Sequence, residues 1–139
     1  MTTEWTYKGK IVNDPPEGAL AFVYLITNKK TKRRYVGKKL FFFTRKKKIK
    51  GRNRRVLVPS DWKEYYGSNK ELQEDVEKLG VSKFKREILH MCSAKGEASY
   101  LEVKEQIERG VLLTDTYYNG IVNVKIHKSH VKGLIVKVT

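Results

Sequence analysis

Apolar positions along the chain first predict two adjacent strands. Residues 19–27 are rich in β-branched and aromatic side chains, which is typical of a buried strand. The polar stretch 28–32 then predicts a hairpin loop, from which the chain returns in a second strand through 34–36. Tyr24 and Tyr35 are therefore expected on neighbouring antiparallel strands.

A helix is predicted over residues 69–79, because residues typical of a helix start and of a helix end stand on either side of apolar residues at helical spacing. Ser68 is the expected cap, Glu71 stands at the third helical position, and Gly80 follows the last turn. Strands are also expected in three later segments, over residues 84–91, 121–126 and 134–138.

A second helix is predicted over residues 97–109. The spacing of Tyr100, Val103 and Ile107 marks the side of this helix that is expected to face the core. Glu102 falls on a different side, so its carboxylate can reach a functional surface without entering the core.

The segment between the second strand and the first helix fits two structures. Residues 41–48 could form a helix, but the sequence Gly51-Arg52-Asn53 followed by apolar 56–58 is typical of a hairpin. The hairpin is the prediction. We therefore expect an insert, over about residues 38–58, that interrupts the order of the elements.

Together these elements predict an α+β fold with a small central antiparallel sheet flanked by helices. A chain of 139 residues can bury one core, so we expect a single domain over 1–139 with its core over about 19–126. The basic insert follows the second strand.

Positive charge is confined to one part of the chain. Fifteen Lys and Arg residues lie between Lys29 and Arg55 with no Asp or Glu among them, while the rest of the chain has 15 basic and 15 acidic residues. Such a focused cationic surface indicates a polyanionic partner. A solvated loop is the alternative, but the aromatic residues Phe41, Phe42 and Phe43 within the block favour an ordered nucleic-acid surface.

Other features narrow the class of protein. Cys92 is the one cysteine, which excludes an intramolecular disulfide and a multi-cysteine zinc site. No apolar run approaches the length of a membrane span, and the N-terminal residues lack the form of a signal peptide. We expect no membrane partner and a cytoplasmic location, which is the host cytoplasm if the protein is phage-encoded.

A motif of tyrosines points to a family. Tyr24, followed after ten residues by Tyr35-Val36-Gly37, resembles the signature of the GIY-YIG nuclease superfamily. The downstream order of Arg45, Glu102 and Tyr118-Asn119 is also similar to that family. The segments 60–68 and 83–89 are closest in look to small phage-encoded, homing-type members. The resemblance covers roughly residues 20–125.

The resemblance implies a magnesium-dependent endodeoxyribonuclease that hydrolyses backbone phosphodiester bonds. One Mg²⁺ or Mn²⁺ ion per site would be held by Glu102, with Glu105 as the alternative ligand. One of Tyr24 and Tyr35 would position or deprotonate the attacking water, and the other would bond the scissile phosphate. Arg45 would stabilise the transition-state charge, unless a neighbouring lysine does so.

The remaining expectations concern the substrate. Asn119 is expected near the site as a polar clip for the glutamate helix. DNA, expected to be double-stranded, would be bound by Gly37, Lys38, Lys39, Lys46, Lys47, Lys48, Arg52, Arg54 and Arg55. A homodimer on DNA is one route to double-strand cleavage. Two other functions stay open: a non-catalytic basic protein that binds RNA or DNA, and a junction resolvase of the same fold.

Overall fold

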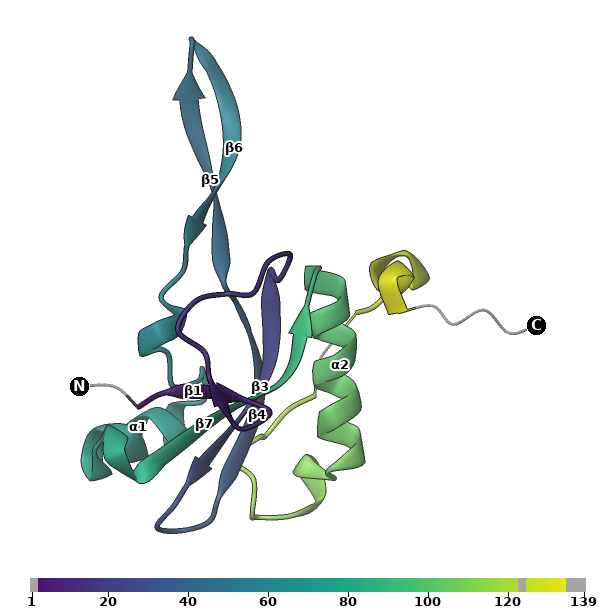
Figure 1. Ribbon diagram of the computed structural model, residues 1–139. Helices are drawn as coiled ribbons and strands as arrows, with labels where there is room; N and C mark the ends of the chain where they lie inside the picture. The colour runs from purple at the N-terminus through teal and green to yellow at the C-terminus, as the bar shows by residue number, and fades with distance from the viewer. Residues whose placement is uncertain (1–2, 123–124, 135–139) are drawn as a thin grey trace.

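The computed structural model describes residues 3–122 and 125–134, and a five-stranded sheet forms their centre (Figure 1). Its strand order is β2-β1-β7-β3-β4. The strands are β1 (Trp5–Tyr7), β2 (Lys10–Ile11), β3 (Ala21–Asn28), β4 (Arg34–Leu40) and β7 (Phe84–Cys92). β3 pairs antiparallel with both β4 and β7, whereas β1 joins β7 in parallel. The α+β class is thus confirmed, with a mixed sheet in place of a purely antiparallel one.

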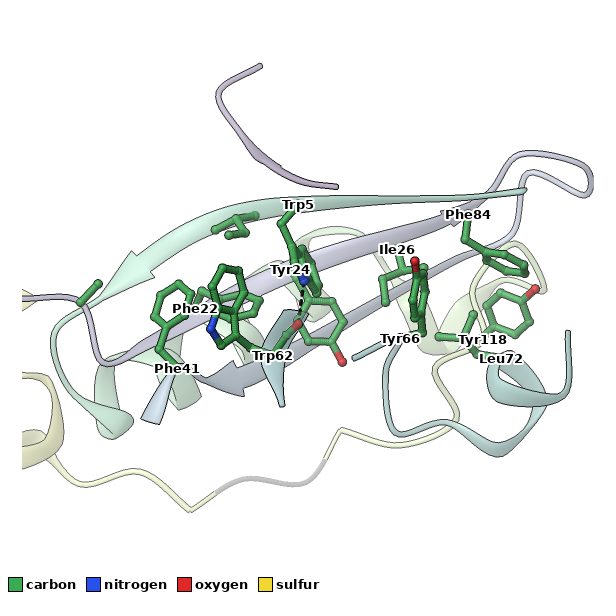
Figure 2. Packing of buried hydrophobic residues seen from close by; sticks show 12 residues of the cluster. Trp5, Phe22, Tyr24, Ile26, Phe41, Trp62, Tyr66, Leu72, Phe84 and Tyr118 are labelled. Atoms are coloured by element: carbon green, nitrogen blue, oxygen red, sulfur yellow. Dashed lines mark hydrogen bonds between the residues drawn. The ribbon is translucent and has the colours of Figure 1, made fainter. Parts of the chain in front are cut away.

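β3 is buried on both faces because it lies between β7 and β4 and is covered on each side. Its Phe22 and Tyr24 side chains pack in an aromatic cluster with Trp5 and Trp62, as Figure 2 shows. The indole N–H of Trp5 donates to the carbonyl of Trp62 at 2.8 Å within this cluster. The opposite face of β3, which carries Val23, packs in a second cluster that includes Ala98 of α2. This double coverage explains the continuous apolar run.

The first helix, α1 (Lys70–Leu79), begins one residue later than predicted. Asn69 is its cap, with the side-chain oxygen accepting from the N–H of Leu72 at 2.9 Å. The expectation that Ser68 caps the helix is wrong, because the Ser68 hydroxyl is hydrogen-bonded to the hydroxyl of Tyr35 instead. Gly80 ends the helix as predicted. Short 3₁₀ turns flank it: η1 (Trp62–Glu64) and η2 (Val81–Lys83).

The second helix, α2 (Lys95–Glu108), covers one face of the sheet, but with a different side from the one predicted. Ala98 and Gln106 are buried, whereas Tyr100 is 44% exposed and Ile107 is 64% exposed. The prediction that Tyr100, Val103 and Ile107 face the core is wrong, because this side of α2 borders residues 126–131 near the C-terminus and not the sheet. The turn η3 (Val111–Leu113) follows α2.

The basic insert is a hairpin, so the prediction is confirmed and the helical alternative is excluded. β5 (Phe42–Ile49) and β6 (Arg52–Pro59) form a separate two-stranded sheet that projects from the rest of the molecule (Figure 1). The two-residue turn at Lys50 and Gly51 has positive φ at both positions, as a tight hairpin requires. We call residues 42–59 the arm. It is shorter than the expected insert, since residues 38–40 belong to β4.

The two expected C-terminal strands are not found among the described residues. Residues 121–122 and 125–126 are irregular, residues 128–134 form the 3₁₀ segment η4 (Lys128–Leu134), and residues 123–124 and 135–138 lie outside the described part. A further strand cannot pair at the edge of β4 near Val36, because the Asn119 side chain occupies that edge. No helix in the described residues is both long and apolar enough to cross a membrane.

Candidate active site

Tyr24 and Tyr35 meet above Gly37. Tyr24 of β3 lies opposite Gly37 of β4, and Tyr35 stands two residues before Gly37 on the same face of that strand. The ring centroids of the two tyrosines are 6.1 Å apart. A Cβ atom at Gly37 would lie 2.3 Å from the Tyr24 hydroxyl and 2.9 Å from the Tyr35 ring. The missing side chain therefore makes room for the tyrosine pair.

β4 continues through Gly37 to Leu40, so the chain does not turn at this residue. The residue is also buried. Its contribution to the site is space for the Tyr24 hydroxyl. That Gly37 also binds DNA stays a prediction.

A third tyrosine and a lysine complete this side of the site. The Tyr65 ring stands edge-on to Tyr24, with centroids 5.9 Å apart. The Lys39 ammonium lies 4.1 Å from the Tyr65 ring centroid and 2.6 Å from a carboxylate oxygen of Asp61. Strand alternation places Lys39 on the same face of β4 as Tyr35 and Gly37. That alternation could have distinguished Lys39 from Lys38 in the sequence, whereas Tyr65 carried no such signal.

Glu102 approaches the same point from α2. It lies close enough to both tyrosines that its charge contributes to the raised pKa values of Tyr24 and Tyr35, although burial is the larger cause for each. Burial also raises the pKa of Glu102, while the charge and the backbone N–H of Lys38 act in the opposite direction. A half-buried carboxylate with a raised pKa is typical of a functional site that takes a cation.

β4 is the edge strand of the sheet, so α2 on one face and the tyrosines on the other face can approach each other around this edge. β4 is the last strand of the sheet, so the N–H and carbonyl of Val36 point outward. Asn119 binds both groups, accepting from the N–H at 3.0 Å and donating to the carbonyl at 2.8 Å. Gln106 of α2 donates to the same carbonyl at 3.2 Å. Asn119 is thus a clip on the strand, and Gln106 attaches α2 to that strand one helical turn after Glu102.

The hydroxyl of Tyr24 is buried and makes no hydrogen bond of normal geometry in the described structure, although the Tyr65 hydroxyl is near enough to help raise its pKa. An unsatisfied buried hydroxyl costs free energy, so such a group is usually reserved for a water molecule or a ligand. Tyr35, in contrast, shares a hydrogen bond of 3.1 Å with Ser68. The raised pKa of Tyr24, caused first by burial and then by Tyr65 and Tyr35, keeps its hydroxyl neutral.

Glu105, the alternative metal ligand, is already engaged. One carboxylate oxygen is 2.9 Å from the Arg109 guanidinium and the other is 3.0 Å from the His90 ring. Burial would raise the pKa of Glu105, but these two partners together lower it. Within residues 3–122 and 125–134, no three His, Cys, Asp or Glu side chains cluster closely enough to hold a metal. A metal here would rest on one carboxylate, which is Glu102.

Arg45 lies apart from the tyrosines and Glu102. It is on the arm, where its guanidinium is 5.0 Å from the Phe43 ring centroid and donates to the carbonyl of Thr44. Six of the residues expected to bind DNA are on the arm with it: Lys46, Lys47, Lys48, Arg52, Arg54 and Arg55.

A hollow of about 380 Å³ lies between the base of the arm and the start of α2. Lys38, Lys39 and Lys95 line it, and Ala21, Leu40, Phe43 and Ala98 supply apolar walls. The Lys38 ammonium donates to the Ser99 hydroxyl at 2.6 Å. The cationic arm and the site at Gly37 are thus joined by a lysine-lined surface.

Buried Arg86 fixes the segment that carries Tyr65, a role that the sequence did not reveal. Its side chain is 2% exposed and stacks between the rings of Trp5 and Tyr66. The guanidinium donates to the carbonyls of Lys63 and Tyr65 at 2.8 Å and 2.9 Å. Tyr65 is therefore held by a charge-assisted network and not by a loop alone.

Comparison with known proteins agrees with this architecture. A family model described as "Putative endonuclease segE, GIY-YIG domain" matches residues 5–122. Neither the comparison with curated proteins nor the comparison with solved structures finds a match. The matched residues include the whole sheet, both helices, Tyr24, Tyr35, Glu102 and Asn119. The domain is a nuclease domain with a nucleic acid as its substrate, and the chain belongs to the GIY-YIG nuclease superfamily.

Proposed function

We propose that the chain is a magnesium-dependent endonuclease that hydrolyses phosphodiester bonds of double-stranded DNA at the site around Gly37. The observation that carries this proposal is that half-buried Glu102 lies near enough to the buried hydroxyl of Tyr24 for its charge to raise the pKa of that hydroxyl. An aromatic core or a plain binding surface needs neither group.

The donor set fits one Mg²⁺ or Mn²⁺ ion. Magnesium prefers oxygen ligands and is commonly held by one or two carboxylates, substrate phosphate and water. Glu102 supplies such a carboxylate, and burial, which raises its pKa, supports a role for a nearby cation in stabilising its charged form. A bound ion would polarise the scissile phosphate and neutralise charge on the leaving oxygen.

The two tyrosines would act as neutral hydroxyl groups. Ionisation of either is opposed by burial, by Tyr65 and by Glu102, although Ser68 partly offsets this for Tyr35. The buried Tyr24 hydroxyl would bond a phosphate oxygen or a water that reaches it. The Tyr35 hydroxyl can exchange Ser68 for the attacking water, holding it in line with the phosphorus.

Lys39 is the better placed cation for stabilising the transition state. Its ammonium is half-buried beside Tyr65, and Asp61 fixes its position, so little reorganisation is needed when charge develops. Arg45 is exposed on the arm, where a contact with the DNA backbone is the simpler role. We propose Lys39 for the catalytic role and Arg45 for backbone contact.

A plasmid-nicking assay in Mg²⁺ tests the function. Glu102→Ala should reduce the cleavage rate by roughly 10³-fold or more, because several kcal/mol of transition-state charge stabilisation are lost, while DNA binding is retained. Glu108→Ala is the matched control on the same helix: Glu108 is exposed and pairs with Lys104, so that variant should cut normally. If the wild type binds DNA but cuts it under no divalent ion, the chain is a non-catalytic binder.

The same assay separates the two cations and the substrates. Lys39→Gln should lower turnover about 10²-fold, and Arg45→Gln less than about tenfold, mainly through affinity. The reverse ranking would restore Arg45 as the catalytic cation. Four-way junctions cut faster than linear duplex would identify a junction resolvase, and a rate that rises with the square of protein concentration would indicate a dimer on DNA.

A further inference from the structure

The arm carries positive charge on both of its faces. Its register pairs Lys46 with Arg55 and Lys47 with Arg54. Because side chains alternate along a strand, these two pairs lie on opposite faces of the ribbon. Residues 42–59 hold eight Lys or Arg and no Asp or Glu, so neither face is neutralised within the arm.

This arrangement works against the stability of the arm on its own. Like charges directly opposite each other across a β-ribbon are destabilising, and here they occur in two successive pairs. All side chains from Thr44 to Arg55 are exposed, so no core supports them. A ribbon of this kind gains stability when anionic groups lie against both faces.

The requirement for anionic groups on both sides selects the shape of the partner. A ribbon resting on a flat anionic surface would use one face and leave the other in solvent. A groove of duplex DNA has phosphates along both walls, and the major groove of B-form DNA, about 12 Å wide, admits a two-stranded β-ribbon. The deep, narrow major groove of A-form RNA does not.

We propose that the arm inserts edge-on into the major groove of B-form DNA, with each face directed at one phosphate wall. The inference rests on the proposed function only in taking DNA as the substrate. Insertion of the arm would bring the adjoining DNA backbone to Lys38, Lys39 and Lys95, which line the hollow at the base of the arm. The same DNA backbone would then lie at the site around Gly37.

Three charge-matched variants of the full chain test this proposal. Lys46→Gln/Lys48→Gln/Arg55→Gln removes three charges from one face, and Lys47→Gln/Arg52→Gln/Arg54→Gln removes three from the other face, where Arg45 remains. The control, Lys29→Gln/Lys30→Gln/Lys32→Gln, removes three exposed charges from the loop between β3 and β4. Binding is measured by fluorescence anisotropy in EDTA, with a DNA duplex of about 20 base pairs and an RNA duplex of the same sequence, over a range of salt concentrations.

Each arm variant should weaken binding to the DNA duplex at least about tenfold at 0.1 M salt. Raising the salt from about 50 to 200 mM weakens DNA binding by some factor, and for each arm variant this factor should be roughly 40-fold smaller than for the wild type. The reason is that three lost phosphate contacts lower the slope of log affinity against log salt by about 2.7. The loop variant should change DNA affinity less than about threefold, and all three variants should have equally small effects with the RNA duplex.

Several results would overturn the proposal. If only one of the two arm variants lost DNA affinity, the ribbon would lie flat on DNA with one face. Equal effects of arm and loop variants would mean that only total charge matters, and equal losses on RNA would remove the fit to the groove. Cleavage by the wild type is scored separately in the nicking assay, so a protein that binds through the arm without cutting would refute the nuclease proposal and leave this one standing.

Discussion

At the residue scale, the site depends on the absence of a side chain at Gly37. The Tyr24 hydroxyl occupies the space where a Cβ atom would lie, and the Tyr35 ring borders that space. The backbone of Gly37 has no positive φ, so conformational freedom is not the reason for glycine here. The close approach of the two tyrosines is the reason.

Gly37→Ala should therefore damage both the fold and the activity. The added methyl group must displace the buried Tyr24 ring, and overpacking of this kind costs about 1–3 kcal/mol of unfolding free energy. We expect urea denaturation to show that loss, together with a large drop in cleavage rate. Gly120→Ala is the control, since a Cβ there meets nothing within 4 Å and its φ is not positive. Equal stability of the two variants would mean that Tyr24 can move freely.

Some site residues could be predicted from sequence because a motif fixes their spacing. Tyr24 and Tyr35 lie on paired strands as expected, and the charge of Glu102 is near enough to act on both. The part played by Tyr65 and Arg86 could not be predicted, because it depends on contacts between segments far apart in the chain. Arg45 was expected near the tyrosines from the family resemblance, but it lies on the arm, away from them.

At the element scale, the edge strand β4 connects the parts of the site. Its outward backbone groups are bound in succession by Tyr118 and Thr116 at Arg34, and by Asn119 at Val36. Each contact replaces the bonds that a further strand would make. The edge is thereby closed to other strands, while the stretch around Gly37 stays accessible to Glu102.

Asn119→Ala should expose how much the fold depends on this clip. The N–H of Val36 would be left buried without a partner, which costs about 1–3 kcal/mol, whereas its carbonyl would keep Gln106. We expect a matching drop in the urea midpoint and slower cleavage, because α2 and β4 would separate more easily. Asn13→Ala, at an exposed position, serves as the control. Unchanged stability in Asn119→Ala would show that water replaces the clip.

The helix face shows why patterns of apolar residues can mislead. Periodicity predicted that the stripe with Tyr100 and Ile107 would face the core, but the sheet is contacted by small Ala98 and polar Gln106. Gln106 is buried because it bonds the Val36 carbonyl, not because it is apolar. A search for hydrophobic residues cannot detect a face chosen by hydrogen bonding to a strand edge.

At the scale of the whole molecule, binding and chemistry occupy separate regions joined at the base of the arm. The arm contains eight of the 15 charges of the cationic segment and projects from the rest of the molecule, while acidic and basic residues balance outside residues 29–55. The hairpin itself could be predicted, since Gly51 marks its turn. Its direction could not, because it is set at the base, where Ser60 donates to the carbonyls of Phe41 and Leu40.

The most direct test of the account is the position of a metal ion in a complex with uncleaved DNA. Crystals of Tyr35→Phe with a DNA duplex and Mn²⁺ would keep Glu102 intact, and anomalous scattering would locate the ion. We predict one ion about 2.1 Å from a Glu102 carboxylate oxygen, bound also to a backbone phosphate beside the Tyr24 hydroxyl. An ion held by Glu105, or DNA bound with no ion at Glu102, would contradict the account.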